Sequence, residues 1–170
     1  CDMDPLYLFV FTNIASTEGF LTVSTLILIF LVVKQKSKQA TLFFTTTAGL
    51  MLSTGILKET LRIPRPENAL IEVAGYALPS GHASGSAFLA LCICYLARNF
   101  KKPLRYSIYI GAVLITLAVG ISRIQFGVHT PFQVGVGYLL GIVWAIAFIA
   151  FSSRVLKIPT STKPKTVRNN

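Results

Sequence analysis

Two histidines lie among basic residues in this sequence, and these are the side chains best suited to chemistry. His82 ends the segment Pro79-Ser80-Gly81-His82, which leads into a long apolar run, and His129 follows the pair Ser122-Arg123 after five residues. Two more cations precede the first histidine, Lys58 and Arg65. Arg matches phosphate oxygens with a planar fork, and Lys supplies a compact positive charge. If these residues converge, they predict an anion site, most simply for phosphate.

We expect the Pro79-to-His82 segment to begin a helix. Ser80 is suited to cap it, and Gly81 lets the backbone approach a ligand closely. The free N–H groups and the positive end of the helix dipole then face the anion. An ordinary serine-capped helix explains the segment when it is taken alone, but His82 in the first turn favours a site.

Two imidazoles beside a phosphate permit nucleophilic catalysis followed by hydrolysis. One neutral imidazole attacks phosphorus, and the other, protonated, donates a proton to the leaving oxygen. The sequence has no cysteine or carboxylate cluster with metal-ligand spacing, so we expect neither a metal nor another cofactor. The electrostatic work on the transition state then falls to the cations.

The composition predicts a polytopic membrane protein. Hydrophobic residues make up 53% of the 170 residues and charged residues only 13%, and the mean hydropathy is +0.65. Several apolar stretches approach or reach the roughly 17 to 25 residues that cross a bilayer. We therefore predict an all-α membrane protein. Its five transmembrane helices are expected at about 18–33, 41–57, 82–98, 106–121 and 131–151, with a short interfacial helix at 5–14.

These helices predict one integral-membrane domain over residues 1–151. A polar loop with prolines at about 59–79 joins the second and third spans. The remaining residues, 152–170, are basic and polar, and we expect a disordered cytoplasmic tail.

The charges of the chain separate onto two sides when the five spans alternate. Twelve of the 16 Lys and Arg residues fall on one side, without any acid: Lys34, Lys36, Lys38, Arg98, Lys101, Lys102, Arg105, Arg154, Lys157, Lys163, Lys165 and Arg168. All six acidic residues fall on the other side: Asp2, Asp4, Glu18, Glu59, Glu67 and Glu72. The positive-inside rule therefore predicts an outward N-terminus and a cytoplasmic C-terminus.

The same sorting explains the net charge of +10 by topology rather than by nucleic-acid binding. Four basic residues remain on the outer side, together with both histidines: Lys58, Arg62, Arg65 and Arg123. Any one of them alone is explained as an anchor at a helix end, Arg62 above all. Ionisable residues gathered at the ends of membrane helices nevertheless indicate a functional site.

The order of these residues resembles a known signature. Lys58, six residues and Arg65-Pro66 come first, then Pro79-Ser80-Gly81-His82, then Ser122-Arg123, five residues and His129. This order is similar to the three-part signature of the type 2 phosphatidic acid phosphatase superfamily. That superfamily includes membrane lipid phosphatases, glucose-6-phosphatase and the vanadium haloperoxidases. The resemblance covers about residues 40–150.

The resemblance implies a role for each matching residue. His129 corresponds to the nucleophile that forms a phosphohistidine intermediate, and His82 to the general acid that later helps to activate water. The phosphate oxygens would be held by Lys58, Arg65 and Arg123, assisted by Ser80 and the Gly81 amide. The resemblance also implies a helical bundle core and no requirement for metal.

Two features depart from the family pattern. The family usually has an Asp four residues after the nucleophilic histidine, where this chain has Gln133. An amide still accepts a hydrogen bond and sets the imidazole tautomer, but it lacks the charge that stabilises an imidazolium. Glu59, Glu67 or Glu72 could supply that charge, although solvated loop acids explain each of them. The common membrane form also has six crossings, and the 5–14 segment either replaces the first or is a part of it.

The sequence thus favours a membrane phosphatase acting on a lipid phosphate, at the outer face of what we expect to be a bacterial inner membrane. The candidate substrates are phosphatidate, phosphatidylglycerol phosphate, an isoprenyl diphosphate and a lipid A phosphate. A sugar phosphatase of the glucose-6-phosphatase kind is the alternative enzyme. A catalytically weak phospholipid-binding protein and a phosphotransferase with another acceptor also remain open, as do the oligomeric state and an internal eukaryotic membrane.

Overall fold

The computed structural model describes residues 17–67 and 69–157. All regular structure in these residues is helical, as predicted. The helices are α2 (Thr17–Val33), α3 (Ser37–Leu61), α4 (Gly81–Ala97), α5 (Lys102–Gln125) and α6 (Pro131–Lys157). The predicted interfacial helix at 5–14 lies outside the described residues, as does the chain beyond residue 157.

Three of these helices are long and apolar enough to cross a membrane, namely α3, α5 and α6, while α2 and α4 are shorter apolar helices. The helices extend beyond several predicted spans. In particular, α6 continues to Lys157, so residues 152–157, predicted as disordered tail, are helical. Ser152 is fully buried, and the Ser153 hydroxyl lies 3.4 Å from the Tyr95 hydroxyl. The change to polar residues after position 151 indicates where the membrane-spanning part of the sequence ends. The helix itself continues further because its residues still pack against α4.

Helix α4 occupies the centre of the bundle. It packs most extensively against α6 and α5, and α3 packs against α6 on the other side. Close approach of α4 and α6 requires a small residue, because a Cβ at Gly137 would lie 2.6 Å from the Ser80 carbonyl oxygen. The Ser80 N–H also donates to the Gln133 carbonyl at 3.3 Å. The first turn of α4 therefore packs in direct backbone contact with α6.

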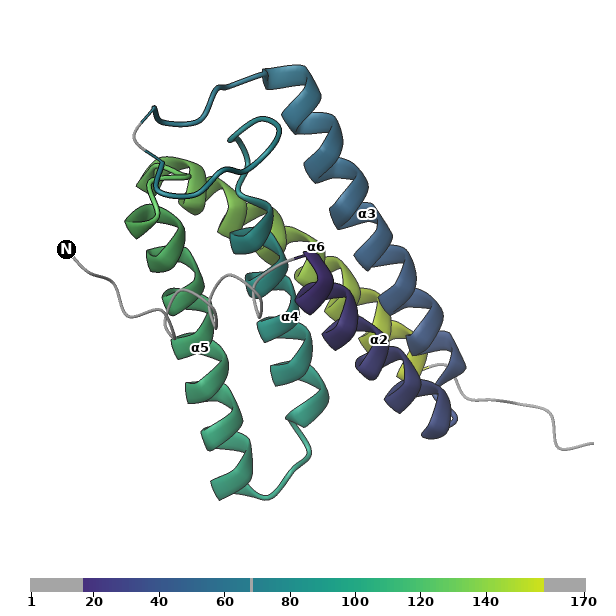
Figure 1. Cartoon of the computed structure of the whole chain (residues 1–170). Helices are drawn as coiled ribbons and strands as arrows, with labels where there is room; N and C mark the ends of the chain where they lie inside the picture. Colours follow the sequence, from purple (N-terminus) through teal and green to yellow (C-terminus); the bar gives the residue numbers. More distant parts are fainter. Residues whose placement is uncertain (1–16, 68, 158–170) are drawn as a thin grey trace, which may run out of the picture.

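The connections between helices separate onto the two ends of the bundle. Figure 1 shows the long connection 62–80 and the short α5–α6 connection at one end, and the α2–α3 and α4–α5 turns at the other. The first end carries all the segments of the predicted site, and the second carries the basic turns with Lys34, Lys36, Arg98 and Lys101. This arrangement agrees with the two-sided distribution of charge read from the sequence.

Candidate active site

A cavity of about 550 Å³ opens at the end of the bundle where the predicted site segments meet. Six predicted site residues line it: Lys58, Arg65, Gly81, His82, Arg123 and His129. They come from α3, the 62–80 connection, α4, α5 and the α5–α6 connection. Residues separated by up to 71 positions in the sequence, from Lys58 to His129, therefore face one volume.

His129 has a defined hydrogen-bonding arrangement at both ring nitrogens. Its Nε2 lies 3.3 Å from Arg65 Nη1, and its Nδ1 lies 3.3 Å from Gln133 Oε1. A guanidinium only donates, so Nε2 is the acceptor and Nδ1 carries the proton that is donated to Gln133. The lone pair of Nε2 therefore points toward the guanidinium of Arg65.

The orientation of the Gln133 amide is set by the neighbouring backbone. The Thr130 N–H donates to Gln133 Oε1 at 3.0 Å, and the Gln133 N–H donates to Thr130 Oγ1 at 3.3 Å. Because Oε1 already accepts from a backbone donor, it is the oxygen and not the NH₂ group that faces His129. Gln133 thus contacts the imidazole through its amide oxygen, and Thr130 holds that amide, which the sequence did not reveal.

The surroundings of His129 favour its neutral form. Burial is the main cause that lowers its pKa to about 4, with the positive charge of Arg65 second, while hydrogen bonds to Gln133 and the Ala77 backbone act in the opposite direction. A neutral imidazole that is not protonated at Nε2 is the form required of a nucleophile. The imidazole therefore remains in that form well below neutral pH.

Arg65 and Lys58 are held by backbone carbonyls rather than by acidic side chains. Arg65 donates to the carbonyls of Gly75 at 3.1 Å, Ala74 at 3.2 Å and Val128 at 3.1 Å. Lys58 Nζ donates to the Tyr76 carbonyl. No pattern in the sequence indicates these partners, because every residue has a carbonyl group and only the path of the backbone determines which ones lie near the cations.

Arg123 approaches the cavity from inside the bundle. Its side chain is 2% exposed, its guanidinium carbon lies 4.9 Å from the centre of the Phe126 ring, and its Nε donates to Ser122 Oγ at 3.3 Å. The carbonyl of Arg123 accepts from the His129 N–H at 3.3 Å. The buried cation and the candidate nucleophile are consequently held in one short backbone segment.

Ser80 differs from the sequence prediction in one respect. It is the N-cap residue of α4, but its side chain makes no capping hydrogen bond. Its hydroxyl is buried and has no partner among the described residues, while its carbonyl accepts from the Ser84 N–H at 3.0 Å. Ser80 Cβ packs beside Gly137, which directs the side chain to the α6 side of the helix start. The predicted side-chain cap is therefore wrong, and the fully buried Ser80 is not among the residues that line the cavity.

Several basic and acidic residues near the site are not part of the cavity wall. Arg62 is exposed, ends α3 in the left-handed conformation and donates to the Glu59 carbonyl at 3.0 Å. The carboxylates of Glu59, Glu67 and Glu72 are all exposed, and no hydrogen bond joins any of them to His129 within the described part of the chain. None of these acids therefore takes over the place of the Asp that the family usually has at position 133.

Comparison with known proteins identifies the family. The model of the PAP2 superfamily matches residues 39–157, which include every predicted site residue. The chain belongs to the PAP2 superfamily. The family resemblance found in the three sequence segments is thus confirmed.

One relative and one solved structure show how far the similarity extends. Phosphatidylglycerophosphatase B of Bacillus subtilis is 32% identical over 104 residues, which are 59% of this chain and 51% of the relative. The chain thus spans about half the length of that protein. The crystal structure of a transmembrane PAP2-type phosphatidylglycerolphosphate phosphatase from Bacillus subtilis superposes with a TM-score of 0.80 at 25% identity, covering 90% of this chain and 80% of the other. The helical membrane fold is confirmed.

Proposed function

We propose that this chain is an integral-membrane phosphatase that hydrolyses a phosphate ester on a lipid. One observation carries the proposal: the cavity that joins both histidines to three cations continues into an apolar wall. Membership of a phosphatase superfamily supports the chemistry. The substrate class follows from the wall, because a lipid is a ligand with a phosphate at one end and hydrocarbon at the other.

His129 is the nucleophile in this proposal. The Nε2 lone pair forms a bond to phosphorus as the ester P–O bond breaks, which gives a phosphohistidine. The proton stays on Nδ1, which donates a hydrogen bond to Gln133 Oε1, and this keeps the imidazole in the required tautomer. His82 gives its proton to the leaving oxygen, then accepts a proton from water as that water attacks phosphorus and breaks the N–P bond.

The cations stabilise the charge that develops on the phosphoryl oxygens. Lys58, Arg65 and Arg123 line the same cavity, and the N–H groups at the start of α4, including that of Gly81, add backbone donors. The Ser80 hydroxyl is buried without a partner among the described residues, and we assign it as a further hydrogen-bond donor to a phosphoryl oxygen. These groups support a reaction that requires no metal ion, and full activity in EDTA tests that point.

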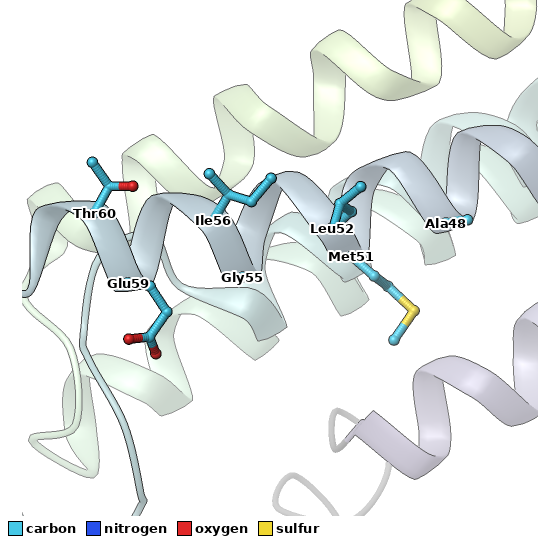
Figure 2. A pocket seen from close by; sticks show the side chains of 7 residues that line it. All are labelled: Ala48, Met51, Leu52, Gly55, Ile56, Glu59 and Thr60. Carbon is cyan, nitrogen blue, oxygen red and sulfur yellow. The ribbon is translucent and has the colours of Figure 1, made fainter.

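The shape of the cavity favours a lipid that enters from the bilayer. Its apolar wall includes Leu89 and Ile93 of α4 and Ile115 of α5. Figure 2 shows a second hollow along the exposed face of α3, and Met51 and Gly55 line both this hollow and the cavity. A water-soluble sugar phosphate has no hydrocarbon chain that could pack against this apolar wall. The relatives named above act on phosphatidylglycerol phosphate by name, and we take this lipid as the first candidate.

The proposal includes the topology. All five described helices cross the membrane, with α2 and α4 as the short spans, and they form one domain that includes the helical residues 152–157. The site faces outward, to the periplasm of a bacterial cell, because the basic turns at Lys34–Lys36 and Arg98–Lys101 belong on the cytoplasmic side. Labelling of a cysteine introduced beyond residue 157, in a protein whose Cys1, Cys92 and Cys94 are replaced by serine, tests this orientation, and labelling from outside the cell contradicts it.

Phosphate release by the detergent-solubilised protein tests the function. The panel contains phosphatidylglycerol phosphate, phosphatidate, an isoprenyl diphosphate, a lipid A phosphate and glucose 6-phosphate. We expect release from at least one lipid, and none from the sugar. His82→Ala should lose activity on the alkyl ester yet retain more of it on p-nitrophenyl phosphate, whose leaving group needs no proton. Absence of release from every compound by folded protein contradicts the proposal.

A further inference from the structure

Tyr138 of α6 makes a hydrogen bond to α5 below the site. Its hydroxyl donates to the backbone carbonyl of Thr116 at 2.7 Å. Tyr138 lies five residues after Gln133 on α6, and Thr116 lies seven residues before Arg123 on α5. Because α5 packs chiefly against α4 and only slightly against α6, this bond is a main link between the helix of Arg123 and the helix of Gln133.

The link depends on a notch in α5 at Gly120. A Cβ at this position would overlap the Tyr138 hydroxyl and lie 2.9 Å from Val134 Cγ1. Thr116, Gly120 and Arg123 are spaced i, i+4 and i+7, which places them along one face of the helix. The notch that receives Tyr138 therefore lies on the face of α5 that carries Arg123, one turn away from it.

Thr116 extends the link to α4. Its Oγ1 donates to the Ala112 carbonyl at 2.8 Å and lies 3.5 Å from the Ser86 carbonyl. Ser86 follows His82 by one helical turn. One threonine thus contacts the three helices that carry or adjoin the two histidines and the buried arginine. Polar contacts between helices in a membrane are directional, so they oppose rotation of one helix against another.

We propose that Tyr138 is a positioning residue, whose hydroxyl in the Gly120 notch fixes the rotation of α5 on α6 and so places Arg123 relative to His129. The proposal rests on the proposed function, in which Arg123 binds the phosphoryl group beside the nucleophile. The Arg123 side chain is almost fully buried and stacked on Phe126, so its position follows its backbone. A small rotation of α5 therefore moves the guanidinium away from the phosphate.

Tyr138→Phe tests the proposal with the least disturbance. It keeps the ring and removes only the hydroxyl, and the Thr116 carbonyl retains its helical N–H partner. We expect kcat/KM to fall about tenfold, the inhibition constant of inorganic phosphate to rise, and the melting temperature to change little. The matched control is Tyr106→Phe, an exposed tyrosine at the other end of α5, which should change none of these.

Gly120→Ala fills the notch, and we expect it to lower kcat/KM by about a hundredfold. Its matched control is Gly111→Ala on the same helix, where a Cβ meets nothing within 4 Å. If Gly120→Ala does not fold, Tyr138→Phe alone decides. Loss of melting temperature in Tyr138→Phe with unchanged turnover and phosphate inhibition would overturn the proposal, since the bond would then serve stability only.

The proposed function and this inference fail in different ways. If the wild-type protein hydrolyses a lipid phosphate and Tyr138→Phe matches it, the function stands and the inference fails. If the wild-type protein hydrolyses nothing but is stabilised against melting by inorganic phosphate, the function fails, and a smaller stabilisation in Tyr138→Phe than in Tyr106→Phe supports the inference. A folded wild-type protein that neither hydrolyses nor binds phosphate overturns both.

Discussion

The two ends of the bundle are held together by different kinds of contact. Towards the end with the basic turns, the ring of Phe43 lies 5.7 Å from that of Phe88 and 5.5 Å from that of Phe148, and all three side chains are fully buried. At the other end, Arg65 donates to three backbone carbonyls and contacts His129. Apolar packing holds helices together without strict directions, whereas hydrogen bonds fix orientation. We therefore expect the aromatic end to contribute mainly stability, and the hydrogen bonds at the other end to fix the positions of the site residues.

The largest effect on activity is expected at His129, the proposed nucleophile. His129→Ala should lower kcat by about 10⁴-fold or more, because no other group takes over the bond to phosphorus. Phosphate release measured on protein of unchanged melting temperature checks this. Trapping a phosphorylated histidine by rapid acid-free quenching sharpens the test, since wild-type protein should carry it and His129→Ala should not. Full turnover by His129→Ala would contradict the assignment.

The next effect is expected at the aromatic end and concerns stability. Phe88→Ala should lower the free energy of unfolding by about 3–5 kcal/mol because it leaves a cavity among the rings. Below its melting temperature the variant should retain most of its kcat/KM. Phe44→Ala, a neighbour of Phe43 that is 60% exposed, is the matched control and should change little. A large loss of activity in folded Phe88→Ala would show that the two ends are not separable.

A smaller effect is expected when the charge of Arg65 is kept and its geometry is changed. Arg65→Lys should lower kcat/KM by about tenfold to a hundredfold, because one ammonium cannot reach the Ala74, Gly75 and Val128 carbonyls together with a phosphate oxygen. The exposed Arg62→Lys serves as the control, and its kcat/KM should stay at the wild-type value. Equal losses in both variants would indicate a general charge effect.

The smallest expected effect is a shift in the pH dependence of kcat/KM. The pKa of His129 is lowered to about 4, so its nucleophilic form persists at neutral pH and kcat/KM should fall only as the pH approaches that value. Gln133→Glu places a carboxylate beside Nδ1, which stabilises the imidazolium and raises that pKa. The acid limb of kcat/KM should then move up by about one to three pH units.

The control for this experiment is Gln35→Glu, an exposed glutamine in the α2–α3 turn. It adds the same charge far from the site and should leave the limb in place. A limb that does not move in Gln133→Glu would mean that His129 is not the group that sets it.

Much of the site was predictable because its residues are chemically distinctive. Lysine, arginine and histidine are rare in membrane helices, so Lys58, His82 and Arg123 are distinctive within apolar sequence. The helices were also predictable, since hydrocarbon length sets their span. Their ends were not, as the six further helical residues of α6 show, because packing continues past the hydrocarbon.

What could not be predicted depends on the path of the backbone. The carbonyls of residues 74–76 that bind Arg65 and Lys58 belong to an irregular connection with no periodic pattern. The free Ser80 hydroxyl depends on which side of the helix start faces α6. Tyr138 is one aromatic residue among many in an apolar span, and its hydrogen bond to Thr116 depends on the packing of α6 against α5.

The carbonyls that hold Arg65 and Lys58 have a consequence for turnover. Both cations donate to carbonyl oxygens of the 62–80 connection, so in the proposed reaction a phosphate oxygen competes with these carbonyls for the same N–H groups. If the proposed reaction takes place, the carbonyls of residues 74–76 would accept these N–H groups again as the product phosphate leaves. The connection would then weaken the binding of the product.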